Sequence, residues 1–261
     1  MDIKNIMRKT IDITQTAGKI ILENWDRDRQ VHKKGRIDLV TDTDYAVEKF
    51  LKRELGGLLP AAGFMAEEST QSKNLEPGMT WIIDPLDGTT NFAHYIPMLA
   101  VSVALWSDGE PLLGIVHLPL FRETFSALKG QGALLNNKPI QATETKNMQD
   151  ALVATGFPYT IREDVDEVLK ILRRVLVSAR GVRRPGSAAF DLAYTACGRY
   201  DAFYETGLKP WDTAAGMLLV REAGGKITRF DGSDYTPGDP DILASNTHLH
   251  CKLLALTKPG S

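Results

Sequence analysis

The sequence has few cysteines and no long apolar run. Its two cysteines, Cys197 and Cys251, have neither the spacing of a metal-binding pair nor that of a disulfide framework. No apolar stretch approaches the roughly 18 residues that a membrane-spanning helix needs. The first residues, 1–18, are amphipathic and charged throughout, unlike a targeting segment. We therefore expect a cytoplasmic protein with reduced thiols and no membrane partner.

An excess of charge of one sign is also missing. The formal net charge is −2, and the basic residues are scattered rather than gathered into blocks. This pattern argues against a nucleic acid or an anionic membrane as the partner and favours a small molecule. With 261 residues, 43% of them hydrophobic, the chain can bury a sizeable core as one large domain or two closely packed halves.

The first half of the chain combines two helices with a series of strands. Apolar residues at helical spacing predict a long amphipathic helix over residues 2–26 and a second over 42–55, which Gly56 and Gly57 are expected to end. Closely spaced strand patterns then predict an antiparallel sheet. These strands are expected at residues 63–68, 80–84, 98–106, 111–118, 123–128 and 132–137.

The second half alternates strands with helices, which is typical of an α/β architecture. A weak boundary falls near residues 137–150, where no long flexible linker occurs. We therefore expect an α plus antiparallel-β half over 1–145 and an α/β half over 146–261, packed into one compact unit. The expected strands of the second half are 150–155, one near Val182, 201–205, 226–230 and 241–245, and its expected helices are 163–179, 187–198, 211–223 and 246–256.

The segment "WIIDPLDGTTNF" (residues 81–92) places two acids, Asp84 and Asp87, at the end of an apolar strand. Pro85 has no N–H for a strand ladder, so the chain is expected to leave the sheet there. Gly88 allows close approach of a ligand, and Thr89 opens a short helix whose N–H groups suit an anion. Two carboxylates beside an anion require cations between them, which favours Mg²⁺. The alternative is that both acids merely cap a turn.

Other acids lie at the ends of predicted elements. Glu67 and Glu68 follow the strand-like "GFMA", and Asp212 begins a helix directly after Pro210 and Trp211. Asp212 has an alternative role as an ordinary helix cap, and the two glutamates could be solvated charges. Local patterns do not establish that these segments converge on the Asp84 segment.

Four motifs in order resemble the inositol monophosphatase family of Mg²⁺-dependent, lithium-sensitive phosphatases. They are "DLVTDTD" (38–44), "AEES" (66–69), "DPLDGTTN" (84–91) and "WDTAAGMLLVREAGG" (211–225). The similarity covers nearly the whole chain, and the segment "FYETGLKPWD" is most similar to the bacterial branch. The resemblance implies an α+β or α/β fold, a layered αβαβα sandwich of the type that this family shares with fructose-1,6-bisphosphatase.

The resemblance also implies two to three Mg²⁺ ions in each active site. The first ion would be held by the Glu67 and Asp84 carboxylates and by the backbone carbonyl of Leu86. A second ion would lie between Asp84, Asp87 and Asp212, and a third, more loosely bound ion would use Glu67. The expected reaction is direct attack of a metal-activated water on a phosphate monoester, with no phosphorylated enzyme intermediate.

The family pattern further assigns Thr89, hydrogen-bonded to Asp44, to orient and deprotonate the attacking water together with Glu67. Lys33 matches a lysine of the family's mobile metal-site loop, with an ordinary surface lysine as the alternative. The groups that the resemblance places against the substrate are Asp87, Gly88, Thr89, Arg183, Ser187, Ala188, Glu205 and Asp212.

Several of these assignments have structural alternatives. Glu205 matches an acid that binds the hydroxyls of inositol, but it could be a cross-strand charge. Ser187 could act only as a helix cap, and Arg183 could reach either the substrate or a subunit interface. His248 and His250 form a close pair in the expected last helix, where residues two apart face in different directions, so a metal site there is disfavoured.

The function implied is Mg²⁺-dependent hydrolysis of inositol 1-phosphate to inositol and phosphate. Relatives act by the same mechanism on fructose 1,6-bisphosphate, 3′-phosphoadenosine 5′-phosphate or NADP, and these substrates remain alternatives. A protein that acts mainly as a regulatory or binding partner is a further alternative, against which the retained acids argue. A homodimer and inhibition by lithium are expected from the resemblance alone.

Overall fold

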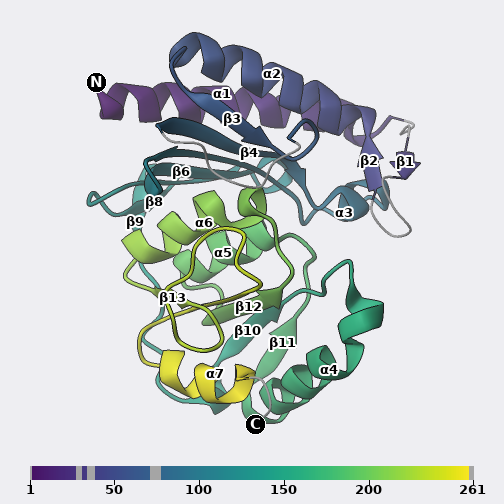
Figure 1. Cartoon of the computed structure of the whole chain (residues 1–261), viewed down its shortest axis with the longest axis vertical. Helices are drawn as coiled ribbons and strands as arrows, with labels where there is room; N and C mark the ends of the chain where they lie inside the picture. Colours follow the sequence, from purple (N-terminus) through teal and green to yellow (C-terminus); the bar gives the residue numbers. More distant parts are fainter. Residues whose placement is uncertain (1, 28–30, 34–38, 71–77, 259–261) are drawn as a thin grey trace.

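The computed structural model describes residues 2–27, 31–33, 39–70 and 78–258, without the side chains of Val31 and Lys33. Helices and sheets alternate in layers, with a helix pair outermost, then a large sheet, a second helix pair, a smaller sheet and two further helices (Figure 1). This order confirms the predicted layered αβαβα fold.

The outermost helices and the large sheet come from the first half of the chain. Helices α1 (Ile3–Trp25) and α2 (Asp42–Leu58) cover one face of a seven-stranded sheet. Its order is β3 (Gly63–Ala66), β4 (Met79–Asp87), β5 (Ala100–Ser107), β6 (Glu110–Leu118), β7 (Glu123–Leu128), β8 (Ala133–Leu135) and β9 (Lys138–Ile140). The sheet is antiparallel, as predicted, apart from the parallel pair β3–β4.

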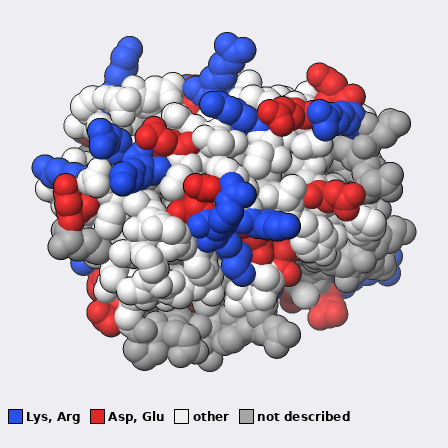
Figure 2. Space-filling view, turned by 90° about the horizontal axis from the view of Figure 1, so that it is seen from above, with Lys and Arg blue, Asp and Glu red and all other residues white. Residues whose placement is uncertain are grey.

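Short elements complete this half. β1 (Val31–Lys33) pairs with β2 (Leu39–Thr41) in a two-stranded sheet, and α3 (Thr89–Ala93) follows β4 directly. Two 3₁₀ turns, η1 (Pro119–Phe121) and η2 (Met148–Asp150), lie before β7 and β10. The outer surface formed by α1 and α2 carries both basic and acidic side chains (Figure 2), as their scatter along the sequence suggests.

The second half supplies the inner helix pair, the smaller sheet and the last helices. α5 (Ala188–Ala196) and α6 (Pro210–Glu222) lie between the two sheets (Figure 1). The five-stranded sheet has the order β11 (Gly181–Arg183), β10 (Leu152–Thr155), β12 (Ala202–Thr206), β14 (Asp241–Ser245) and β13 (Lys226–Thr228). Helices α4 (Ile161–Ser178) and α7 (His250–Thr257) cover its far face. The division into halves at residue 145 remains a prediction.

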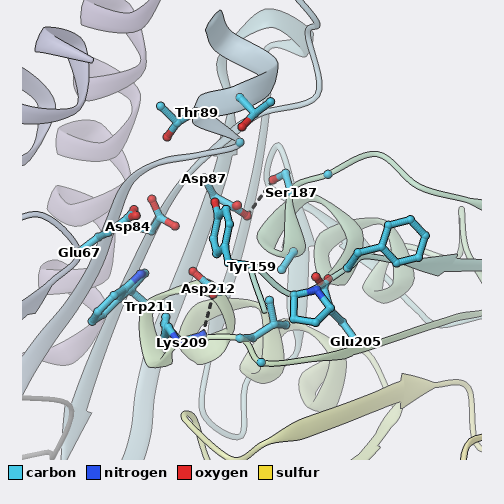
Figure 3. Close-up of a pocket in the computed structure, with 18 of the residues that line it drawn as sticks. Glu67, Asp84, Asp87, Thr89, Tyr159, Ser187, Glu205, Lys209, Trp211 and Asp212 are labelled. Atoms are coloured by element: carbon cyan, nitrogen blue, oxygen red, sulfur yellow. Dashed lines mark hydrogen bonds between the residues drawn. The ribbon is translucent and has the colours of Figure 1, made fainter. Parts of the chain in front are cut away.

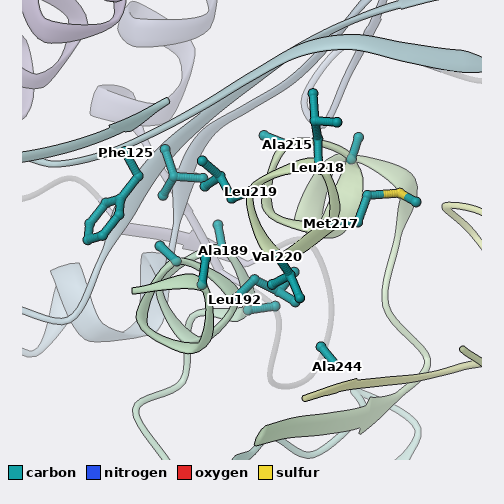
Figure 4. Packing of buried hydrophobic residues seen from close by; sticks show 14 of the residues in the cluster. Phe125, Ala189, Leu192, Ala215, Met217, Leu218, Leu219, Val220 and Ala244 are labelled. Atoms are coloured by element: carbon teal, nitrogen blue, oxygen red, sulfur yellow. The ribbon is translucent and has the colours of Figure 1, made fainter. Parts of the chain in front are cut away.

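The layers are held together by close packing of small and aliphatic residues. Figure 4 shows Leu192 of α5 and Leu219 of α6 in one buried cluster beneath the large sheet. A Cβ atom at Gly114 would lie 2.7 Å from the carbonyl oxygen of Ala215. Glycine at this position in β6 therefore lets α6 approach the sheet closely, which positions the first residues of α6.

Strand β4 differs from the prediction at Pro85. The chain does not leave the sheet there, because β4 continues to Asp87 with an irregularity in its pairing with β5. Asp84 pairs with Ser102 and Asp87 with Ala100, so three steps along β4 match two along β5. This extra residue is a β-bulge, and it accommodates the missing N–H of Pro85. Since Ala100 and Ser102 share one face of the sheet, the bulge brings both acids to that face.

Other boundaries also differ from prediction. Helix α2 continues through Gly56 and Gly57 to Leu58, since glycine is permitted within a helix at a modest cost. The short strand β9 was not predicted. The last helix begins only at His250, so the prediction that the His248 and His250 pair lies within it was wrong. Within the described residues, no helix is both long enough and apolar enough to cross a membrane.

Candidate active site

A cavity of about 490 Å³ lies where β4, α3, α5, β12 and α6 meet. Acidic side chains from both halves of the chain line it (Figure 3). The acids are Glu67, Asp84, Asp87, Glu205 and Asp212. The structure thus brings together every carboxylate that the family resemblance assigned to metal or substrate.

The bulge of β4 positions Asp84 and Asp87, and backbone N–H groups hold them. The Leu86 N–H donates to Asp84 Oδ1 at 3.0 Å. Asp87 Oδ2 accepts from the Ala189 N–H at 2.6 Å and from the Ser187 hydroxyl at 2.8 Å. These two donors belong to the start of α5, where a negative charge is favourable. The hydrogen bonds join the two halves of the chain at the cavity.

Asp212 and Glu67 complete the acidic side of the cavity. Asp212 is at the third position of α6, and its Oδ2 accepts the Lys209 N–H at 2.7 Å in a capping arrangement. The predicted alternative role as a helix cap is therefore real, and Asp212 lines the cavity at the same time. Glu67 follows β3, and its carboxyl group lies close enough to Asp84 to share a hydrogen bond. Glu68 points elsewhere, since it is absent from the cavity wall.

Burial and mutual repulsion raise the pKa values of these acids. Burial is the largest cause of the raised pKa of Asp84, and the charges of Glu67, Asp87 and Asp212 add to it. Burial likewise raises the pKa of Asp212 and takes that of Asp87 to about 7, although the N–H of Ala189 opposes the shift at Asp87. A cluster of this kind favours protons or cations between its members.

The donor chemistry of the cluster fits a hard divalent cation. Asp87 and Asp212 each use one oxygen for the protein hydrogen bonds given above, which leaves the second oxygen to other ligands. Carboxylate oxygens and a backbone carbonyl are the ligands that Mg²⁺ prefers. Within the described part of the chain, however, no three His, Cys, Asp or Glu side chains converge as a ready-made metal site. Carboxylates approach one another further only when positive charge separates them.

A hydrogen-bonded pair lies beside the acids. The Thr89 hydroxyl donates to Asp44 Oδ1 at 2.9 Å, which is the contact that the resemblance predicts. Asp44 is fully buried and also accepts the Thr41 N–H at 2.8 Å, so its orientation is fixed. Gly88 precedes Thr89 with φ of +100°, and a Cβ there would lie 3.0 Å from the Met98 carbonyl oxygen. Only glycine suits this turn from β4 into α3.

Most of the predicted substrate contacts line the cavity, but Arg183 does not. Gly88, Thr89, Ser187, Ala188 and Glu205 all form part of its wall. Both adjacent arginines are exposed, but only Arg184 lines the cavity, whereas the Arg183 guanidinium donates to the Val182 carbonyl at 3.1 Å. The prediction for Lys33 concerns a side chain outside the described structure.

Sequence reasoning missed one side of the cavity. Phe157, Pro158 and Tyr159 follow β10 and line the cavity, together with Ile161 and Lys209. Their position directly after a strand of an α/β sheet is a signal that could have identified them. Asp191 was also missed. It is buried within α5, neither of its carboxyl oxygens has a hydrogen-bond partner among the residues that the structure describes, and burial raises its pKa.

The histidine pair does not form a site. His248 is partly exposed before α7, with Nε2 2.9 Å from Glu144 Oε2. His250 is buried between the hydroxyls of Thr228 and Ser245, at 2.9 and 2.8 Å. The two rings therefore have separate partners, and a shared metal site is not supported.

Comparison with known proteins agrees with this architecture. The family model described as "Inositol monophosphatase family" matches residues 2–259. An inositol-1-monophosphatase from Caulobacter vibrioides is 42% identical over 228 residues, which cover 86% of this chain and 89% of that protein. A protein of Xylella fastidiosa named Nus factor SuhB is 41% identical over 232 residues, which cover 88% of this chain and 82% of that protein.

Solved structures give the same result. The crystal structure of the extragenic suppressor protein suhB from Bartonella henselae is 37% identical and superposes with a TM-score of 0.93. The match covers 98% of this chain and 100% of that chain. With a family model and relatives matched over nearly the full length, the chain belongs to the inositol monophosphatase family.

Proposed function

We propose that this protein is a Mg²⁺-dependent phosphatase that hydrolyses inositol 1-phosphate to inositol and phosphate. The observation that carries the proposal is the convergence of Asp84, Asp87 and Asp212 on one cavity, where burial and mutual repulsion raise their pKa values. Such an arrangement destabilises the empty site and favours bound cations. Family membership supports the same chemistry.

The residues that would hold two to three Mg²⁺ ions are Glu67, Asp84, Asp87, Asp212 and the carbonyl of Leu86. Bound Mg²⁺ lowers the pKa of a coordinated water and neutralises charge on the phosphate. The N–H groups of Leu86, Ala189 and Lys209 fix the carboxylates in place, so little reorganisation is needed when the substrate binds.

Thr89 and Asp44 would position the attacking water. Because the Thr89 hydroxyl donates its proton to Asp44, its oxygen lone pairs can accept a hydrogen bond from a water molecule. That hydrogen bond would turn a lone pair of the water toward phosphorus, and Glu67 would take up its proton. The water oxygen forms the new P–O bond, the ester P–O bond breaks on the opposite side, and the leaving alkoxide takes a proton from solvent.

Other substrates and a regulatory role are alternatives to this proposal. Fructose 1,6-bisphosphate, 3′-phosphoadenosine 5′-phosphate and NADP are alternative substrates for the same site. A regulatory role is the second candidate function, because one of the relatives described above is named a Nus factor. A cytoplasmic location, a homodimer and inhibition by lithium are further predictions from the family resemblance, and light scattering tests the homodimer directly.

A panel assay tests the proposal. Phosphate release is measured with and without Mg²⁺ from inositol 1-phosphate, fructose 1,6-bisphosphate, 3′-phosphoadenosine 5′-phosphate and NADP. We expect Mg²⁺-dependent release with the highest kcat/KM on inositol 1-phosphate. Inactivity on every compound contradicts the phosphatase assignment, and a strong preference for a nucleotide contradicts the inositol assignment alone.

A further inference from the structure

One wall of the cavity is formed by three adjacent parallel strands. β11, β10 and β12 are neighbours in the smaller sheet, so their carboxyl ends lie at one edge. Arg184 follows β11, Phe157 follows β10, and Glu205 is the second-last residue of β12. All three line the cavity on the side contributed by the second half of the chain. This wall faces whatever part of a substrate extends away from the acidic cluster.

Arg184 is held over an aromatic ring, and no residue in the described part of the chain uses the donors of its guanidinium. Its guanidinium carbon lies 5.3 Å from the centre of the Phe157 ring, a favourable cation–π distance. The guanidinium also passes directly over Gly186, which has φ of +90° and no side chain to obstruct it. Among the described residues, the Arg184 guanidinium has no ion-pair partner and no hydrogen-bond acceptor. Its fork of N–H donors is therefore oriented by packing and open to a ligand.

Glu205 supplies the complementary acceptor, and a glycine makes space for it. The side chain is buried, and a Cβ atom at Gly156 would overlap the Glu205 carboxyl group. Burial raises the pKa of Glu205 to about 8, while the positive charge of Arg184 opposes that shift. The positive charge of Arg184 therefore stabilises the ionised form of Glu205, although the two side chains do not form an ion pair.

This pair of groups matches hydroxyls better than a second phosphate. A hydroxyl both accepts and donates hydrogen bonds, so neighbouring ring hydroxyls can accept from Arg184 and donate to Glu205. A second phosphate would be attracted to Arg184, but a phosphate dianion has no proton to donate to Glu205, and an ionised Glu205 would repel it. The apolar surface of Phe157, Pro158 and Ile161 suits the C–H face of a saturated ring.

We propose that Arg184 is a specificity-determining residue that donates hydrogen bonds to ring hydroxyls of a polyol phosphate, opposite Glu205. The proposal rests on the phosphatase function proposed above and names a contact for the part of the substrate that does not react. Arg184 takes the place of its neighbour Arg183, for which the sequence analysis left open a substrate contact or a subunit interface.

Two substrates and a matched control test the proposal. Arg184→Met keeps an apolar stem over Phe157 and removes the donors, while Arg183→Met makes the same change at the adjacent exposed arginine. Inositol 1-phosphate carries ring hydroxyls and phenyl phosphate carries none. For Arg184→Met we expect kcat/KM on inositol 1-phosphate to fall about 10- to 100-fold, as for loss of a charged hydrogen bond. On phenyl phosphate, kcat/KM should change less than about threefold, and Arg183→Met should leave both substrates unaffected.

A second variant tests the Glu205 side of the same subsite. Gly156→Ala crowds the Glu205 carboxyl and should produce the same selective loss on inositol 1-phosphate, and circular dichroism confirms that each variant is folded. An unchanged kcat/KM on inositol 1-phosphate in Arg184→Met, or an equal loss on both substrates, overturns the proposal. A selective loss on fructose 1,6-bisphosphate instead would assign Arg184 to a second phosphate.

The outcome is separable from failure of the phosphatase assignment. If the wild type hydrolyses neither ester, calorimetric titration of inositol 1-phosphate into the wild type and Arg184→Met still measures the contact. Weaker binding by the variant supports it, and equal binding, or no binding by either protein, overturns it.

Discussion

At the scale of single residues, the site combines acids that repel one another with backbone donors that hold them. Asp87 illustrates this, since the N–H of Ala189 and the hydroxyl of Ser187 fix one of its oxygens. The types of residue at the site could be predicted from the sequence, because carboxylates at element ends form a local pattern. The choice between Arg183 and Arg184 could not, since adjacent residues after a short strand differ only in the direction of their side chains.

Thr89 provides a test of how the water is positioned. Thr89→Ala removes the hydroxyl that joins Asp44 to the cavity, so we expect kcat to fall by about 10²- to 10⁴-fold. Thr89→Ser retains the hydroxyl and should recover most of the turnover. Steady-state kinetics with inositol 1-phosphate measure both variants. A Thr89→Ala enzyme with kcat close to the wild-type value would contradict the assigned role.

Buried His250 predicts a dependence of stability on pH. Burial lowers its pKa to about 4 from an ordinary value of 6.5. The unfolded chain therefore takes up a proton near pH 6.5, whereas the folded chain does so only near pH 4. The free energy of unfolding should be independent of this group above pH 6.5. It should then decrease as the pH falls toward 4, by at most about 1.4 kcal/mol per pH unit.

Urea unfolding between pH 5 and pH 7 measures this slope. In His250→Gln, unfolding should take up about one proton fewer, so the free energy of unfolding should depend less steeply on pH. Burial also lowers the pKa of His117 to about 4, so His117 should account for part of the remaining slope. His248→Gln makes the same change at an exposed histidine and is the matched control for the substitution itself. An identical slope in His250→Gln and the wild type would exclude the contribution of His250.

At the scale of elements, β4 shows how far local patterns reach. The apolar run predicted the strand, and Pro85 correctly marked an irregularity. The prediction that the chain leaves the sheet failed because β5 continues to pair with β4 beyond the bulge. Strand pairing depends on a partner strand elsewhere in the sequence, so the segment around a proline does not by itself determine whether the strand ends there or continues through a bulge. Strands such as β7 and β14, bounded by clear turns, had boundaries that matched prediction.

The close approach of α6 to β6 gives a prediction about stability. Gly114→Ala places a Cβ 2.7 Å from the Ala215 carbonyl oxygen, so we expect a loss of about 1–3 kcal/mol in the free energy of unfolding. Gly57→Ala is the contrasting control, since nothing lies within 4 Å of its Cβ and alanine favours helix α2. It should raise stability by up to about 1 kcal/mol. Thermal unfolding compares the two variants, and an unchanged Tm in Gly114→Ala would contradict the packing account.

At the scale of the whole molecule, the site exists only where the two halves meet. Asp84 and Asp87 come from the large sheet, Asp212 from a helix of the second half, and Ser187 connects the two by its hydrogen bond to Asp87. No local periodicity predicts this convergence, because it depends on the packing of layers far apart in sequence. The family resemblance supplied it, together with the αβαβα order that the structure confirms.

The most direct test of the central claim is the Mg²⁺-dependent turnover of inositol 1-phosphate by Asp84→Asn. This change removes one charge from the middle of the acidic cluster and preserves the shape of the side chain. We predict that kcat falls by about 10³-fold or more while thermal unfolding without Mg²⁺ shows an intact or more stable fold. A folded Asp84→Asn variant with near wild-type kcat would contradict the assignment of this cavity as a Mg²⁺-dependent phosphatase site.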